Sequence, residues 1–250
     1  MRELFRSEHF LMPWEKVPKE EMSAWITSRE EQWKALEGES LHPLEIEGQV
    51  YDPFDIDRIN SLLNQTGMVY GGGYGRFNKP SFFLAELIRK EERYDYQVYY
   101  AGNEVCRDLS TSVAMLQGRC IFMRLDHLKM LLWDKYQELQ GRSFKGLLHE
   151  AFSWYRMGGG SSAPEELYRA IESLSCEIAD LFVLHEVGEA FEDEYGDEWL
   201  SILSQNQERS TEFSVRGVKD LLADTSEMGP LKSIIAYEET GLLYFYMAFL

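Results

Sequence analysis

The stretch Ser81–Ala101, with the sequence SFFLAELIRKEERYDYQVYYA, decides the fold class of this chain. Residues 81–88 and 96–101 are rich in aromatic and aliphatic side chains, whereas residues 89–95 are polar. Two strand-like runs that are separated by a polar turn are typical of a β-hairpin. The stretch therefore predicts two antiparallel strands.

The neighbouring segments extend this hairpin into a sheet. Residues 110–116 and 120–125 form a second pair of strand-like runs, and the dipeptide Gln117-Gly118 between them favours a turn. Residues 68–74 form a further run of this kind ahead of the first hairpin. Together these segments predict an antiparallel β meander of about five strands over residues 68–125.

Helical spacing of apolar residues covers most of the remaining chain. In the first half it predicts a helix at Lys19–Leu36, a loop rich in proline and glycine, and a short helix whose start is formed by Asp52-Pro53 and Asp55. Asp126 is interpreted as the N-cap of the first helix after the sheet. The helices predicted in the second half cover residues 128–139, 144–155, 162–194, 198–223 and 231–249. The predicted fold class is therefore α+β, with an antiparallel sheet followed by a helix-rich C-terminal half.

The run Gly158-Gly159-Gly160-Ser161-Ser162 is the clearest flexible joint in the sequence. It divides the chain into residues 1–157, an α+β region with the antiparallel sheet, and residues 161–250, an acidic helical region. The two regions are either separate domains or parts of a single packed domain.

Charge and cysteine content restrict the class of protein. Acidic residues outnumber basic ones by 43 to 25, and the net charge of −18 would repel DNA and RNA, so we expect no nucleic-acid partner. The three cysteines, Cys106, Cys120 and Cys176, are odd in number and far apart. Free thiols in a reducing compartment are therefore expected, which favours a cytoplasmic protein.

The sequence carries no signal for a membrane or a nucleotide. The apolar run Gly241–Leu250 is ten residues long, whereas a helix needs roughly 20 to span a bilayer. Residues 1–14 have no apolar segment of the kind found in signal peptides. The glycine-rich segment 70–76 is not followed by Lys-Ser or Lys-Thr, so we predict no nucleotide or dinucleotide site. We expect a soluble protein without a membrane partner.

One segment, Leu184–Glu189, combines residue type and spacing in a way that suggests chemistry. An apolar stripe in the predicted helix advances in steps of three and four residues, and the same steps continue to His185 and Glu189. The stripe consists of Leu167, Ile171, Leu174, Ile178 and Leu181. Burying an unpaired carboxylate is costly, so Glu189 requires a proton, a cation or hydrogen-bond donors.

His185 and Glu189 lie four residues apart, so their side chains share one helix face and can bind one cation together. The pattern His-Glu-x-x-Glu at 185–189 resembles the zinc-binding helix of the zincin metallopeptidases, His-Glu-x-x-His, with a carboxylate in place of the second histidine. The resemblance covers the six residues Leu184–Glu189. It implies that His185 and Glu189 are metal ligands and that Glu186 is the general base. The ligand set implies zinc, manganese or iron.

The local motif supplies no third ligand. The candidates elsewhere in the sequence are His149, Glu150, Glu208, Glu212 and Asp220. Between residues 165 and 212 there are 14 acidic residues and two basic ones, and concentrated carboxylates attract cations.

Two classes of function follow from these patterns, and the sequence leaves open whether the protein is an enzyme. The first is a metal-dependent hydrolase built on His185, Glu186 and Glu189. The second is a non-enzymatic binding or regulatory protein whose acidic helical face engages a basic protein partner. The alternative to a metal site is that His185 donates to a backbone carbonyl or forms an internal hydrogen-bonded pair with Glu189. The oligomeric state is also open.

Overall fold

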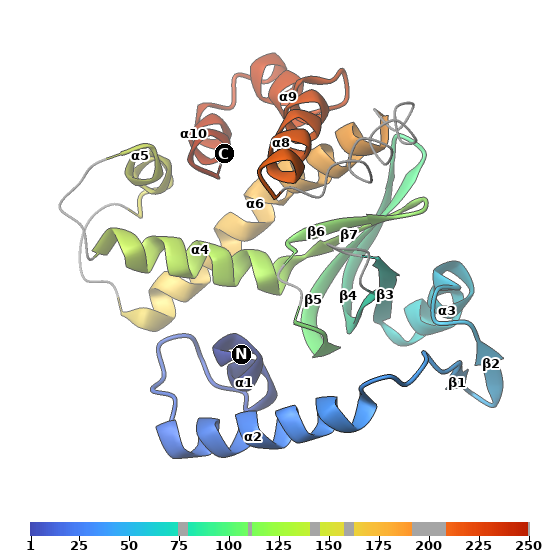
Figure 1. The fold of residues 1–250 in the computed structure, drawn as a ribbon. Coiled ribbons are helices and arrows are strands. Elements are labelled where there is room, and N and C mark those ends of the chain that lie inside the picture. The colour runs from blue at the N-terminus through green and yellow to red at the C-terminus, as the bar shows by residue number, and fades with distance from the viewer. Residues whose placement is uncertain (75–79, 110–111, 141–145, 158–162, 192–208, 250) are drawn as a thin grey trace. The chain divides into compact units, whose positions relative to one another are not determined.

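The computed structural model describes residues 1–74, 80–109, 112–140, 146–157, 163–191 and 209–249 (Figure 1). A β-sheet in the N-terminal half is followed by helices in the C-terminal half, so the predicted α+β class is confirmed. None of the described helices is both long enough and apolar enough to cross a membrane. Cys106, Cys120 and Cys176 carry thiols that are not joined in disulfides, as predicted.

The main sheet has five strands in the order β3-β4-β5-β7-β6. The order differs from that of a simple meander, because β7 and not β6 lies beside β5. Antiparallel pairing is shown for β3 with β4 and for β6 with β7. The strands are β3 (Met68–Tyr74), β4 (Pro80–Arg93), β5 (Tyr96–Arg107), β6 (Ala114–Gln117) and β7 (Cys120–Arg124).

The first hairpin has a shorter turn than the sequence predicts. The predicted turn at 89–95 is wrong, because β4 continues to Arg93 and only Tyr94 and Asp95 connect it to β5. These two residues have φ values of 48° and 67°, the left-handed pair that a two-residue hairpin of type I′ requires. Charged residues at the end of β4 remain in the strand because their side chains have partners on a helix, as described below.

Backbone contacts divide the chain into two compact units. Unit 1 contains Met1–Ile88 and Ala101–Thr111, and unit 2 contains Arg89–Tyr100 and Ser112–Leu250. The predicted joint at 158–162 lies outside the described residues, so the predicted division into 1–157 and 161–250 stays a prediction.

Unit 1 contains two helices that the sequence predicts correctly, α2 and α3, and a small hairpin that it misses. In that hairpin β1 pairs with β2, and Glu47 and Gly48 form the turn with φ values of 51° and 75°. The sequence analysis assigned this segment to a loop, because strands of three residues carry too little periodicity to recognise. The further elements of this unit are α1 (Arg2–Glu8), α2 (Lys19–Leu36), β1 (Leu44–Ile46), β2 (Gln49–Tyr51), α3 (Ile56–Leu63) and the 3₁₀ turn η1 (Asn64–Thr66).

Asn60 of α3 joins this helix to β3, the last strand at one side of the sheet. Its side-chain nitrogen donates to the carbonyl of Tyr70 at 2.8 Å, and its side-chain oxygen accepts from the backbone N–H of Tyr70 at 2.8 Å. Tyr51, Ile59 and Tyr70 form the buried cluster beside this contact. The Asn60 amide thus satisfies both backbone groups of Tyr70 in an apolar environment.

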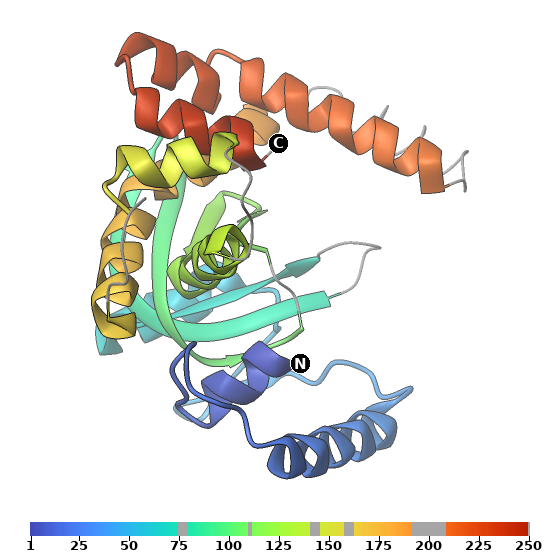
Figure 2. The same cartoon turned by 90° about the vertical axis from the view of Figure 1, so that its left-hand side faces the viewer.

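Unit 2 is mainly helical, and Figure 2 shows α8 extending away from α9 and α10. The single helix predicted at 231–249 is wrong: it is interrupted at Tyr237–Glu239, where Glu238 has a φ of 54°. The break lets α10 turn back, so that Phe245 packs edge-on against Phe152 of α5 at 5.3 Å between ring centroids. The helices are α4 (Leu125–Gln140), α5 (Leu147–Trp154), α6 (Pro164–Phe191), α8 (Arg209–Thr225), α9 (Pro230–Ala236) and α10 (Thr240–Phe249).

The start of α4 differs from the start that the sequence predicts. Helix α4 begins at Leu125, so Asp126 lies in its first turn and is not the predicted N-cap. The predicted helix 198–223 is described only from Arg209, and its earlier part lies outside the described residues.

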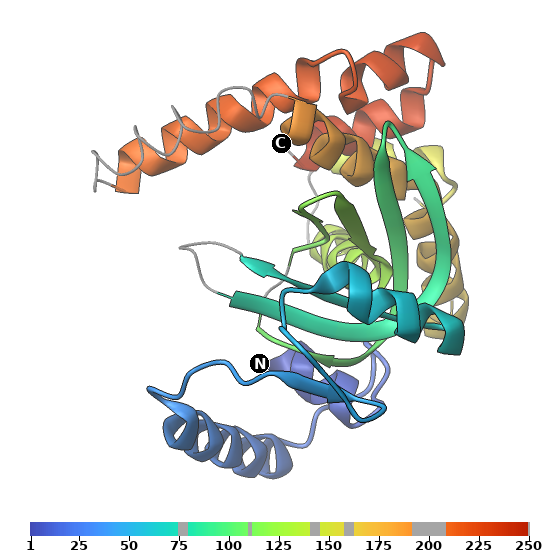
Figure 3. The same cartoon turned by 90° about the vertical axis from the view of Figure 1, so that its right-hand side faces the viewer.

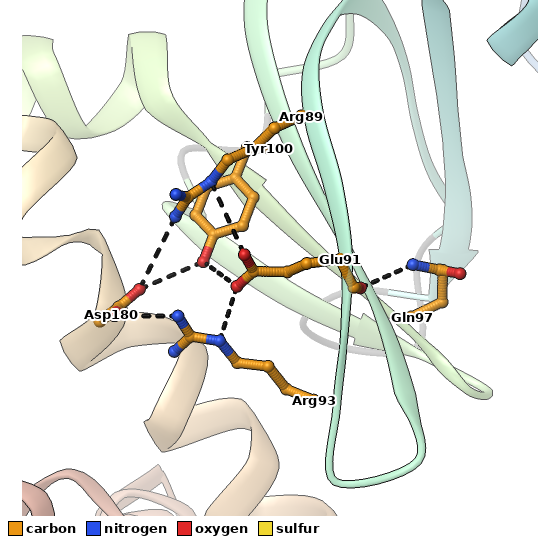
Figure 4. Close-up of polar contacts among 6 residues, drawn as sticks. All are labelled: Arg89, Glu91, Arg93, Gln97, Tyr100 and Asp180. Carbon is orange, nitrogen blue, oxygen red and sulfur yellow. Dashed lines mark hydrogen bonds and ion pairs between the residues drawn. The ribbon is translucent and has the colours of Figure 1, made fainter.

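The tip of the β4–β5 hairpin lies against α6 (Figure 3). Arg93 donates from Nη2 to Asp180 Oδ2 at 3.0 Å and from Nε to Glu91 Oε1 at 2.6 Å (Figure 4). The hydroxyl of Tyr100 lies 3.1 Å from Asp180 Oδ1 and 2.9 Å from Glu91 Oε1, and the guanidinium of Arg89 stacks 3.7 Å from the centroid of its ring. Tyr100 is only 1% exposed, so this network fixes α6 on the hairpin.

On another side, α6 approaches α8 at backbone distance. A Cβ atom built on Gly188 of α6 would overlap the carbonyl oxygen of Ala223 on α8, and a Cβ on Gly229 would overlap the same oxygen. A glycine inside a helix costs about 1 kcal/mol relative to alanine. The close approach of α6 to α8 is the structural reason for a glycine at position 188.

We expect Gly188→Ala to destabilise the protein, because the added methyl group must push α6 and α8 apart. Overpacking of this kind typically costs about 1–3 kcal/mol. The control is Gly217→Ala on α8, where a Cβ meets no described atom within 4 Å and alanine should stabilise the helix by about 0.5–1 kcal/mol. Urea unfolding followed by circular dichroism measures both variants. A Gly188→Ala protein as stable as the wild type would contradict the close approach.

Candidate metal centre

His185 lies on the face of α6 that meets α8. Its Nδ1 is 2.6 Å from Oδ1 of Asp224 on α8, and its Nε2 is 3.5 Å from Oε1 of Glu189, one turn further along α6. The side chains of His185 and Glu189 therefore face each other, as predicted, on the inward side of α6. The structure adds Asp224, which holds the other nitrogen of the ring.

Asp224 is the most buried carboxylate of this group, with only 4% of its surface exposed. Its second oxygen, Oδ2, accepts a hydrogen bond of 3.0 Å from the hydroxyl of Tyr246 on α10. Burial and the charge of Asp224 raise the pKa of this hydroxyl to about 12, so Tyr246 is a stable donor at neutral pH. Three helices thus meet in one chain of hydrogen bonds.

Asp220 and Lys219 complete the group from α8. Lys219 Nζ donates to Oε2 of Glu189 at 3.1 Å. Asp220 lies one helical turn before Asp224. One potential ligand atom from each of His185, Glu189 and Asp220 lies within 4.8 Å of the other two, which is close enough to surround a single metal ion.

The ionisable groups of this site shift one another's pKa values. Burial alone would lower the pKa of His185, but its hydrogen bonds to Asp224 and Glu189 outweigh burial and raise the pKa to about 10. Burial would raise the pKa of Glu189, but the hydrogen bond from His185 and the charge of Lys219 lower it to about 2. Burial and the charge of Glu189 raise the pKa of Asp220. The imidazole is therefore protonated at neutral pH when protons are the only cations available to it.

Glu186 points to a different neighbour. Burial and the charge of Glu189 raise its pKa to about 7, while a hydrogen bond from the backbone of Leu116 on β6 acts in the opposite direction. It does not belong to the group of three potential metal ligands. A carboxyl group with a pKa near 7 can exchange a proton at neutral pH, which is what a general base must do.

The charges at this site do not balance. Among the described side chains of this group, His185 and Lys219 are cationic and four others are carboxylates. When all six groups are ionised, negative charges exceed positive ones, which favours a cation over an anion at this site. The four carboxylates are those of Glu186, Glu189, Asp220 and Asp224.

Two of the other residues that the sequence singled out, His149 and Glu150, have contacts of their own away from this group. His149 and Glu150 lie on α5, where His149 Nδ1 is 3.6 Å from Glu150 Oε1 and 3.4 Å from the hydroxyl of Ser153. Glu208 and the side chain of Glu212 lie outside the described residues. Asp220 is the one candidate third ligand that joins His185 and Glu189 among the described residues.

The sequence analysis missed Lys219, Asp224 and Tyr246. For Asp224 a signal was present, because it follows Asp220 by four residues, and on one continuous helix the two side chains share a face. The predicted helix 198–223 ended one residue too early to include it. The lysine and the tyrosine carried no such signal. Their roles come from contacts between helices that are distant in the sequence.

Residues 1–124 match the family of unknown function (DUF6866) N-terminal domain, and residues 129–250 match the C-terminal domain of the same family. The two domains together span nearly the whole chain. Neither the curated proteins nor the solved structures give a match.

We expect the stability of the metal-free protein to fall as the pH rises from 7 to 10. The pKa of His185 is about 10 in the folded state and 6.5 when unperturbed, so its stabilising contribution is complete below pH 6.5 and is lost as the pH approaches 10. A shift of one pKa unit corresponds to about 1.4 kcal/mol.

Urea unfolding in a chelator at several pH values measures this slope. His185→Gln should flatten it, whereas the control His149→Gln should leave it unchanged. An identical slope in the wild type and in His185→Gln would contradict the assignment to His185.

Proposed function

We propose, for a chain that belongs to the family of unknown function DUF6866, that its helical unit binds a divalent transition-metal ion through His185, Glu189 and Asp220. The observation that carries this proposal is the convergence of one imidazole and two carboxylates within 4.8 Å. The family description assigns no activity. The proposal therefore rests on the geometry of α6 and α8.

The arrangement around His185 supports this role. Histidines that bind a metal through one nitrogen commonly donate the N–H of the other nitrogen to a carboxylate, which fixes the orientation of the ring. Asp224 lies 2.6 Å from Nδ1 and leaves Nε2 directed at Glu189. A metal ion would take the place of the proton that Nε2 shares with Glu189.

The donor set selects the kind of ion. One imidazole nitrogen with carboxylate oxygens suits zinc, manganese and ferrous iron, whereas magnesium and calcium prefer oxygen ligands alone. Three protein ligands leave a coordination position for water, as in catalytic zinc sites. Lys219 neutralises part of the charge of Glu189 and should moderately lower the affinity of the site for a metal ion.

Hydrolysis is the reaction that this site would support, with Glu186 as the general base on the metal-bound water. Two features favour Glu186 in this role. Its pKa of about 7 lies near the operating pH, and it adjoins His185 in the pattern that resembles the zincin helix.

Metal analysis of protein purified without a histidine tag tests the proposal. We expect stoichiometric zinc or manganese in the wild type and in the control His149→Gln, and affinity reduced by more than about 100-fold in His185→Gln and Asp220→Asn. Glu186→Gln should keep the metal but lose any hydrolysis of activated esters or phosphodiesters. Substoichiometric metal in the wild type, or affinity unchanged in His185→Gln, would rule out the site.

A second candidate function is the binding of a basic protein by the acidic face of α6. Four carboxylates at one end of this helix are exposed, and they belong to Glu165, Glu166, Glu172 and Glu177. Exposed charges are screened beyond about 10 Å at 0.1 M salt.

Binding of a lysine-rich peptide should therefore weaken steeply between low and moderate ionic strength, and more so in the wild type than in a Glu165→Gln/Glu166→Gln variant. Fluorescence anisotropy of a labelled peptide measures this difference. Binding that does not depend on ionic strength would count against this second function.

A further inference from the structure

Asp224 is held from two sides, and only one side belongs to the proposed metal site. Its Oδ1 accepts from His185 of α6, and its Oδ2 accepts from the hydroxyl of Tyr246 at 3.0 Å. A carboxylate that is fixed at both oxygens has a defined plane. That plane fixes the direction of His185 Nδ1, and with it the direction in which Nε2 points.

Tyr246 is presented by a helix with its own anchoring. Helix α10 packs on α5, and its Phe245 is fully buried between Phe152 and Tyr155. The end of α10 also reaches α6, where Phe249 lies 6.0 Å from Phe182 between ring centroids. The hydroxyl of Tyr246 is thus supplied by an element whose position depends on packing outside the site.

We propose that Tyr246 is a positioning residue for the metal site, and that cation binding at His185, Glu189 and Asp220 and the docking of α10 stabilise each other. This inference rests on the proposed function. When α10 is docked, Asp224 is held and His185 is directed at the cation. When α10 is displaced, Asp224 loses a donor and can rotate away from Nδ1.

The coupling must act in both directions. If docked α10 increases the affinity for the cation by a given factor, then the cation must stabilise the docked state of α10 by the same factor. The C-terminal helix would therefore respond to occupancy of a site to which it contributes no ligand. A bound cation would therefore stabilise the docked position of α10.

The test compares full-length wild type with Tyr246→Phe and the matched control Tyr244→Phe. Tyr244 lies on the same helix, and its ring packs against Trp154 at 6.1 Å. The probe is Co²⁺ alone, titrated at constant pH, and its visible absorption reports both affinity and coordination geometry. Urea unfolding of each metal-free variant shows whether the fold is intact.

We expect Tyr246→Phe to bind Co²⁺ about five- to tenfold more weakly and with an altered visible spectrum, while Tyr244→Phe matches the wild type. This loss is smaller than the 10–100-fold typical of removing the supporting carboxylate itself. Equal affinity and equal spectra in all three proteins would overturn the coupling and leave the proposed metal site standing. Equal weakening by both substitutions would also overturn it, because a general loosening of α10 would explain both.

A second measurement needs no variant. Amide hydrogen exchange of residues 240–249 in the wild type should slow when Zn²⁺ is added, because binding to the docked state stabilises it. Unchanged exchange in α10 with bound Zn²⁺ would overturn the coupling. A wild type that binds neither Co²⁺ nor Zn²⁺ would overturn the proposed function itself.

Discussion

The helical unit depends on the close approach of α6 and α8 at Gly188. The carbonyl of Ala223 occupies the space that a side chain at position 188 would need, and Asp224 is the next residue along α8. Backbone contact at this point brings the Asp224 carboxylate within 2.6 Å of His185. A side chain at position 188 would have to displace this carbonyl, and Asp224 follows it directly in the chain.

Helix α6 makes polar contacts in three directions along its second half. Asp180 binds Arg93 and contacts Tyr100 at the tip of the β4–β5 hairpin (Figure 4). Glu186 accepts from the backbone of β6, and His185 with Glu189 meets α8. Apolar packing alone would allow a helix to slide or rotate, whereas directional contacts to three elements define its position. The geometry of the proposed metal site depends on this fixed position of α6.

The sequence predicted the elements better than their connections. The period of α6 located His185 and Glu189, because both depend on spacing within one helix. The sequence did not predict the full length of β4, since Arg93 stays in the strand through its contact with Asp180, which lies 87 positions away. The sequence also predicted one helix over the residues that form α9 and α10. These helices are separated at Glu238, and a glutamate gives no sign in the sequence of a left-handed backbone.

The candidate site shows the same limit. Asp220 was among several possible third ligands, and only the crossing of α6 with α8 distinguishes it from His149 or Glu150. Asp224 and Tyr246 act through contacts that span 39 and 22 positions of sequence. A pattern within one helix cannot report such contacts, because they depend on how separate helices pack.

The bidentate contact of Asn60 with Tyr70 bears on self-association. An outer strand with free backbone donors and acceptors can recruit a strand from another molecule, which is a common route to aggregation. Strand β3 contains three consecutive glycines and no charged residue that would discourage such pairing. The side-chain amide of Asn60 imitates the backbone of a neighbouring strand at Tyr70. The backbone N–H and C=O of Tyr70 are thereby already paired at the point where an added strand would need them.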